Sequence, residues 1–273
     1  MTQRRRIVLI AAEAVMIALW AWQGWPWWAL IPLLIAPPVV FTLADFMQIM
    51  GEMNAWIMPF TELLALIKSD EGDEIREDML DSYMKGERNP TTLLALAAAH
   101  EYIGDGAEAQ RYAEEAYALE DGDGLCRQHG IVARLKADAL ILARFDALVV
   151  QGRFSDAAQI MQDRLALSMQ TNFMTALTAW AYFLAEQPDE TRAMLHRIKP
   201  QPRWFRMSHS ISPRYLLIVA HMRHTLGGKD QRAEVLAHLP QILAWEETAQ
   251  RHAGSRYGER LRAVIEDIKQ LPT

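Results

Sequence analysis

The chain has 273 residues, of which 51% are apolar and 23% are charged, and its formal charge at pH 7 is −6. This length provides a core large enough to fold without disulfide bonds, and the single cysteine, Cys126, excludes a disulfide framework and an all-cysteine metal site. With 14 glycines and 12 prolines, the composition also excludes a collagen-like or wholly disordered chain.

The first 45 residues differ sharply from the rest, because Glu13 is the only charged residue between Ile7 and Ala44. Two apolar runs, 7–22 and 25–44, would form helices of about 24 and 30 Å, so the stretch fits two crossings of a bilayer core of about 30 Å. Tryptophans, which favour membrane surfaces, gather at the break between the runs: Trp20, Trp22, Trp25, Trp27 and Trp28. We predict a two-span transmembrane hairpin over 1–45, in contact with the lipid bilayer through 7–44.

The orientation of this hairpin follows from Arg4, Arg5 and Arg6, which precede the first run and are expected to stay in the cytoplasm. The expected location is the cell (inner) membrane, multi-pass, with the N-terminus and the C-terminal domain cytoplasmic. A cleaved secretory signal is the alternative for the first run, although the second run would still anchor the chain. Glu13 is an intramembrane polar residue, and we expect it to be protonated or turned toward the second span rather than to relay protons.

Residues 46–88 form a predicted juxtamembrane helical connector. The methionine-rich stretch 46–68 has polar residues at helical intervals and is typical of an interfacial or docking helix, with a break at Pro59. The stretch 70–81 predicts an acidic amphipathic helix.

The pattern of residues 89–273 predicts pairs of helices, and no segment shows the sustained alternation of apolar and polar residues that a half-buried strand needs. The predicted fold class is therefore all-α. In the clearest unit, 90–124, Pro90 suits a helix start, and Leu93, Leu96, Ala97 and His100 share one face. A turn then leads to a second helix with a narrow face of small residues: Gly104 and Asp105 in the turn, then Ala109, Ala113 and Ala116.

This unit resembles a tetratricopeptide repeat (TPR). Leu93 and Leu96-Ala97 match the large and large-small positions of its first helix, Gly104-Asp105 matches its turn, and Ala109 and Ala116 match its two small residues. A second unit over 139–168 is similar around Gln151-Gly152, and two fainter units follow over 176–198 and 215–239.

The four turns, marked by Gly104, Gly152, Gln187 and Gly227, are separated by 48, 35 and 40 residues, whereas a regular array of this family has a period of about 34. We therefore predict an irregular TPR-like α-solenoid with one extended helix across 125–150. The resemblance implies an interaction scaffold whose partner is a protein, bound as an extended peptide or a helix.

Charge is segregated along this region. Residues 70–123 contain 16 acidic and 4 basic residues, whereas 191–229 contain eight basic residues and no acidic one. The loop 199–213 holds three prolines and combines positive charge with large rings, so it cannot be a continuous helix. The candidate partner- or anion-binding residues are Arg197, Lys199, Arg203, Trp204, Phe205, Arg206 and Arg214.

This basic surface has three possible partners: the chain's own acidic first repeats, an acidic peptide, or the anionic headgroups of a membrane. The first is the simplest interpretation. Nucleic acid is not an expected partner, because removing Arg4–Arg6 and Glu13 from a total of −6 leaves −8 on the rest of the chain.

We expect no catalytic site, no metal and no cofactor. His221 and His224 have a spacing that metal ligands use, but no acidic residue or cysteine nearby in the sequence completes a site, and nucleophile, phosphate-loop and dinucleotide motifs do not occur. The expected function is a membrane-anchored protein–protein interaction scaffold or adaptor. The alternatives are a subunit or assembly factor of a membrane protein complex, whose hairpin packs on other spans, and an enzyme with an unfamiliar site.

Overall fold

The computed structural model describes residues 47, 51, 88–128, 131–166, 168, 171–198, 213–227 and 231–271, and each regular element among them is helical. The chain divides into two units, 1–56 and 57–273, and the elements below belong to the second. They are α4 (Pro90–Ile103), α5 (Gly106–Leu119), α6 (Gly122–Arg127), α7 (Ile131–Val150), α8 (Phe154–Arg164), α9 (Thr171–Leu184), α10 (Pro188–Arg197), α11 (Pro213–Leu226), α12 (Arg232–His238), the short 3-10 helix η2 (Leu239–Gln241), α13 (Ile242–Arg251) and α14 (Arg256–Lys269). The all-α prediction is confirmed for the described residues.

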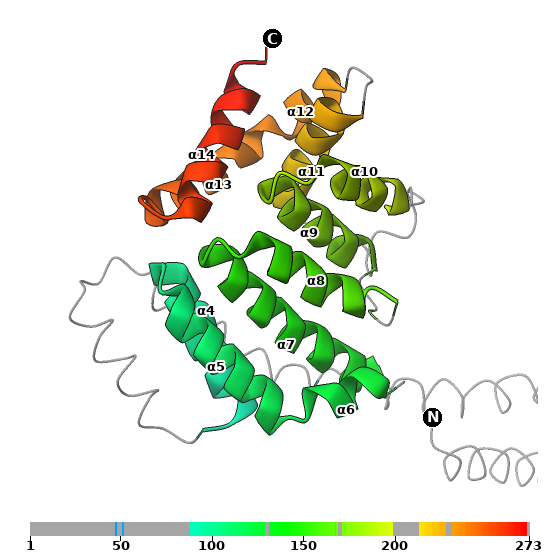
Figure 1. Ribbon diagram of the computed structural model, residues 1–273, viewed down its shortest axis with the longest axis vertical. Coiled ribbons are helices and arrows are strands. Elements are labelled where there is room, and N and C mark those ends of the chain that lie inside the picture. Colours follow the sequence, from blue (N-terminus) through cyan, green and yellow to red (C-terminus); the bar gives the residue numbers. More distant parts are fainter. Residues whose placement is uncertain are drawn as a thin grey trace, which may run out of the picture. The chain divides into compact units, whose positions relative to one another are not determined.

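Four helical pairs stack on one another in chain order (Figure 1). They are α4 with α5, α7 with α8, α9 with α10, and α11 with α12, which correspond to the four predicted units. The second helix of each of the first three pairs contacts the first helix of the next pair, and first helices also touch, α4 on α7 and α9 on α11. Gly104 and Gly152 adopt left-handed backbone conformations in their turns, with φ of 89° and 73°, which explains why glycine stands there.

The first pair forms as its sequence predicts. The Asn89 side chain accepts a hydrogen bond from the backbone N–H of Thr92 at 2.9 Å and so caps α4, which begins with Pro90. Leu93, Leu96 and Ala97 of the predicted α4 face are buried and His100 is half-buried. Three small residues of α5 are at most 1% exposed: Ala109, Ala113 and Ala116. Small residues along α5 let the two helices approach closely.

The extended helix predicted across 125–150 is confirmed over 131–150, and the prediction is wrong in its first part. This stretch is divided between α6, which ends at Arg127, and α7, which begins at Ile131. Gln128 leaves the helix with an extended backbone, φ −77° and ψ 145°, so the chain changes direction before the long α7.

A buried ion pair joins α6, α7 and α8. Arg164 and Asp138 are each 2% exposed in their side chains, and Nε of Arg164 donates to Oδ1 of Asp138 at 2.9 Å. The remaining polar atoms are satisfied, since Arg164 also donates to the carbonyls of Cys126 and Arg134, and the Ser168 hydroxyl donates to Oδ2 of Asp138. A buried charge pair is tolerated where every partner is in place.

The C-terminal helices α13 and α14 pack back onto the later pairs. Trp245 of α13 lies with its ring 5.8 Å from that of Trp180 in α9 and 5.6 Å from that of Tyr215 in α11. The buried face of α14 repeats at helical intervals and belongs to the same core as α7 to α11: Tyr257, Leu261, Val264, Ile265 and Ile268. The C-terminal hairpin, formed by α13 and α14, therefore covers apolar residues along one side of the stack.

The predicted hairpin over 1–45, the helix over 70–81 and most of the connector over 46–88 lie outside the described residues, which include only Met47, Gly51 and Arg88 of that region. Within the part of the chain that the structure describes, no helix combines the length and the apolar character that a membrane crossing requires.

Candidate functional site

The predicted basic surface lies largely outside the described residues. Five of these residues fall in the gap between α10 and α11: Lys199, Arg203, Trp204, Phe205 and Arg206. Glu13, in the N-terminal unit, also lies outside the described residues. Arg197 is exposed at the end of α10, and Arg214 belongs to the first turn of α11, although its side chain is not described. The role of these residues in binding a partner or an anion stays a prediction.

The described charges pair with near neighbours in the fold. In the basic stretch, Arg192 contacts Asp189 at 2.6 Å and Arg223 contacts Glu234 at 3.3 Å. The acidic residues of the first repeat pair within it or with flanking helices: Glu108 with Arg111, Glu114 with Arg144, Glu115 with Arg88, and Glu120 with Lys136. Arg192 and Arg223 therefore pair outside the acidic first repeats. For Lys199, Arg203 and Arg206, which lie outside the described residues, the simplest interpretation above stays a prediction.

Three of the inter-helix turns meet the C-terminal hairpin at one edge of the stack. At the first turn, the Arg251 guanidinium lies 4.1 Å from the ring centre of Tyr102, and a Cβ placed on Gly104 would come within 3.6 Å of His252. At the second, Arg256 donates to the carbonyl of Gly152 at 3.2 Å. At the third, Arg260 binds the α9–α10 turn.

This third contact is the most extensive. Nε and Nη2 of Arg260 both donate to the carbonyl of Leu184 at 3.2 Å, and Nη1 lies 2.6 Å from the Glu186 carboxylate. Leu184 is the last residue of α9, so its carbonyl has no partner within the helix, and a guanidinium satisfies it well.

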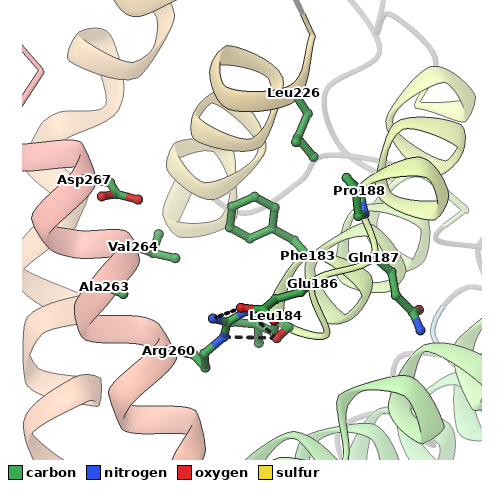
Figure 2. Close-up of a pocket in the computed structure, with 10 residues that line it drawn as sticks. All are labelled: Phe183, Leu184, Glu186, Gln187, Pro188, Leu226, Arg260, Ala263, Val264 and Asp267. Carbon is green, nitrogen blue, oxygen red and sulfur yellow. Dashed lines mark hydrogen bonds and ion pairs between the residues drawn. The ribbon is translucent and has the colours of Figure 1, made fainter.

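A cleft of about 330 Å³ lies beside this contact, between α14, the α9–α10 turn and the end of α11. We call it the α14 cleft (Figure 2). Its apolar lining consists of Phe183, Leu184, Pro188, Leu226, Ala263 and Val264. Its polar lining consists of Glu186, Gln187, Arg260 and Asp267. Figure 2 shows Arg260, Ala263, Val264 and Asp267 along one side of α14, with the Phe183 ring extending into the space opposite them.

The charged groups of the cleft are not balanced. Arg260 is paired with Glu186, whereas the exposed carboxylate of Asp267 stands in no ion pair or hydrogen bond with the described residues. One arginine against two carboxylates gives the described residues of the lining a net charge of −1. A negative group beside apolar walls can hold a cation that carries an apolar stem.

Behind the cleft lies a buried histidine. His221 is 2% exposed, and its ring meets the Phe183 ring edge-on with 5.8 Å between the ring centres. Neither ring nitrogen has a hydrogen-bond partner among the described residues. Burial lowers the pKa of His221 to about 4; the charge of Asp267 raises that pKa and that of His224 lowers it further. His221 is therefore neutral at pH 7, and no group of histidine, cysteine and acidic side chains within the described ranges has a metal-binding arrangement.

Sequence reasoning missed the α14 cleft. The spacing of Tyr257, Leu261, Val264 and Ile268 was a usable signal for an amphipathic helix after the repeats, but no pattern in one sequence places Arg260 beside Leu184, 76 residues away. Comparison with known proteins found no matching family, curated protein or solved structure.

Proposed function

We propose that this chain is a membrane-anchored scaffold or adaptor, in which a two-span hairpin over 1–45 holds a TPR-like α-solenoid at the cytoplasmic face of the cell membrane. The single observation that carries this proposal is the stack of four helical pairs, in which neighbouring pairs contact each other and the first helices also touch, α4 on α7 and α9 on α11. Arrays of this kind present extended surfaces to protein partners. The almost chargeless stretch 7–44 and the preceding Arg4–Arg6 support the anchor and its orientation.

Anchoring gives such a scaffold a physical advantage. A partner that binds weakly in solution is held at a much higher effective concentration when both proteins are confined to one membrane. The proposed second contact of the scaffold is the basic surface around Arg203 and Arg206, whose charge and rings suit an acidic peptide or anionic headgroups.

Two experiments test the membrane anchor and the role of the helical array as an interaction scaffold. The full-length chain is expected to remain with membrane vesicles in alkaline carbonate, and release into the supernatant would contradict the anchor. Proximity labelling from the C-terminus in the native cell is expected to mark a reproducible set of cytoplasmic proteins, and labelling no richer than that of an unrelated membrane-tethered control would contradict the scaffold.

A hairpin exchange separates the scaffold from a subunit of a membrane complex. Residues 1–45 are replaced by an unrelated two-span anchor of the same orientation. The scaffold is expected to keep its labelled neighbours after this exchange, because its contacts lie in the helical array. Loss of those neighbours, with the exchanged protein still present in the membrane, would favour the subunit.

A further inference from the structure

We propose that the α14 cleft binds a lysine or arginine side chain of the partner protein, with the aliphatic stem against the apolar walls and the cationic group beside Asp267. This inference rests on the proposed scaffold function and names the chemistry of one of its contacts.

The walls fit an aliphatic stem. Phe183, Leu226 and Val264 border the cleft from three different helices, so an inserted chain of three or four methylene groups is covered on several sides. Lysine and arginine bury such stems while their charged ends stay near water. The volume of about 330 Å³ is at the lower end for ligand pockets and suits one side chain better than a cofactor.

The charges fit a cation and not an anion. Arg260 is ion-paired with Glu186 and donates to the Leu184 carbonyl, so its positive charge is already balanced by a carboxylate. On the Pro188 side, Arg192 is paired with Asp189 and donates to the Leu226 carbonyl. Asp267 is left as the carboxylate without a partner among the described residues, at one end of the cleft (Figure 2).

The cleft does not suit a quaternary ammonium group. Such ligands are recognised by several aromatic faces around the cation, and among the described residues Phe183 is the one aromatic ring that lines this cleft. A primary ammonium or a guanidinium instead gains a charge-assisted hydrogen bond from a carboxylate. The lining therefore matches the two basic side chains of proteins.

The first test uses small probes on the full-length chain in a neutral detergent, followed through the methyl resonances of Leu184, Leu226 and Val264. n-Butylammonium and n-butylguanidinium are expected to shift these resonances saturably, whereas n-pentanoate is not. Equal or larger shifts with n-pentanoate or with n-butyltrimethylammonium would overturn the proposal.

Variants locate the binding. Asp267→Asn is expected to weaken n-butylguanidinium two- to fivefold, and Asp267→Lys about tenfold or more, as for exposed charge pairs. Ala263→Leu, at an exposed lining position, is expected to fill the cleft and abolish the shifts while the other methyl resonances keep their positions. Glu247→Lys, an equal charge change on an exposed position of α13 outside the lining, is the matched control. Identical affinities for Asp267→Lys and Glu247→Lys would refute the role of Asp267.

The second test identifies the source of the cation. A photo-crosslinking amino acid replaces Gln187, at the rim of the cleft, in the full chain in its native cell. The crosslinked partner peptide is expected to contain lysine or arginine, and the yield is expected to fall with Asp267→Lys and not with Glu247→Lys. A crosslinking yield that is unchanged by Asp267→Lys overturns the cleft proposal but does not bear on the scaffold proposal. Proximity labelling without specific neighbours overturns the scaffold proposal itself.

Discussion

Two junctions of this fold depend on arginine, and they differ in burial. Arg164 lies inside the α6–α7–α8 junction with a side chain 2% exposed, and it meets a carboxylate and two backbone carbonyls. Arg260 lies at the edge where α14 crosses the α9–α10 turn, with a side chain 31% exposed, and it also meets a carboxylate and a carbonyl. The two side chains make nearly the same bonds in different surroundings.

The comparison teaches that the bonds alone do not set the energetic weight of a charged residue. In the interior, water cannot replace a lost partner, so removing one member leaves the other uncompensated. At the surface, water takes over the freed groups and the loss is small. The expected effects below therefore follow burial and not the number of contacts.

The largest effect is expected for Arg164→Ala. This change leaves the Asp138 carboxylate buried without its counter-charge, and breaking such a pair costs about 3–5 kcal/mol. The measurement is urea unfolding of the full-length chain, followed by circular dichroism, with hydrogen exchange of α6 to α8 to locate the loss. Arg164→Met combined with Asp138→Leu is expected to recover part of the stability, because the buried charge is then removed as well. A loss below about 1 kcal/mol for Arg164→Ala would contradict the comparison.

The pairwise architecture around this junction could be predicted from sequence, and the junction itself could not. Leu93 and Leu96 on α4, the small residues Ala109 and Ala116 on α5, and the turn glycines Gly104 and Gly152 are local signals, because each reports the conformation of its own helix or turn. The bond between Arg164 and Asp138 joins residues 26 positions apart, and neither residue type distinguishes a buried partner from an exposed one.

The second effect concerns His221, which is as buried as Arg164 but whose ring nitrogens have no hydrogen-bond partner among the described residues. Its pKa is about 4 in the fold and about 6.5 in an unfolded chain, so the fold favours the neutral ring. This contribution is fully present above pH 6.5 and is lost as the pH falls toward 4. By pH 5 we expect a loss of roughly 2 kcal/mol relative to pH 7.5. Urea unfolding at the two pH values measures it.

A variant and a control isolate this histidine. His221→Met replaces the imidazole with an apolar side chain of similar length that does not titrate. This variant is expected to lose less stability between pH 7.5 and 5, because the titrating group is gone. His196→Gln, at an exposed position of α10, is expected to keep the pH dependence of the original chain. Parallel losses in the original chain and in His221→Met would assign the acid sensitivity to other groups.

The third effect probes the contact of α14 with the second turn. Gly152 has a φ of 73°, and a Cβ placed there would lie 3.0 Å from the Cβ of Arg256. Gly254 has a similar φ of 85°, but a Cβ there would meet nothing within 4 Å. Gly152→Ala is expected to cost about 1–2 kcal/mol from the backbone alone, and the crowding of α14 adds to this.

Gly254→Ala supplies the backbone cost without the crowding, so the difference between the two variants in urea unfolding measures how closely α14 is held to the turn. Adding Arg256→Ala, which keeps the Cβ, is expected to remove only the part that comes from the longer side chain. Equal losses of unfolding free energy for Gly152→Ala and Gly254→Ala would mean that α14 moves away from the Gly152 turn at no energetic cost.

The candidate site shows the same limit of sequence reasoning as the buried junction. The basic loop around Arg203 was found because charge and rings are concentrated in one stretch of chain. The α14 cleft is lined by residues from three helices, among them Phe183, Leu226 and Asp267. None of these residues belongs to a local sequence pattern that indicates a binding site. A site assembled by packing leaves no concentrated signal, whereas a site within one segment does.

The smallest effect is expected for Arg260→Ala, and it is the sharpest check on the comparison. The Arg260 side chain is 31% exposed and Glu186 is exposed, so water can reach the groups that this variant frees. The loss of stability should therefore stay within about 1 kcal/mol despite the removal of three hydrogen bonds. The effect should instead be local. Amide exchange of Glu186 and Gln187, whose N–H groups close the end of α9, should become faster, and Arg260→Lys should restore it only in part, since an ammonium lacks the planar fork of a guanidinium. A loss comparable to that of Arg164→Ala would mean that bond number, and not burial, governs both junctions.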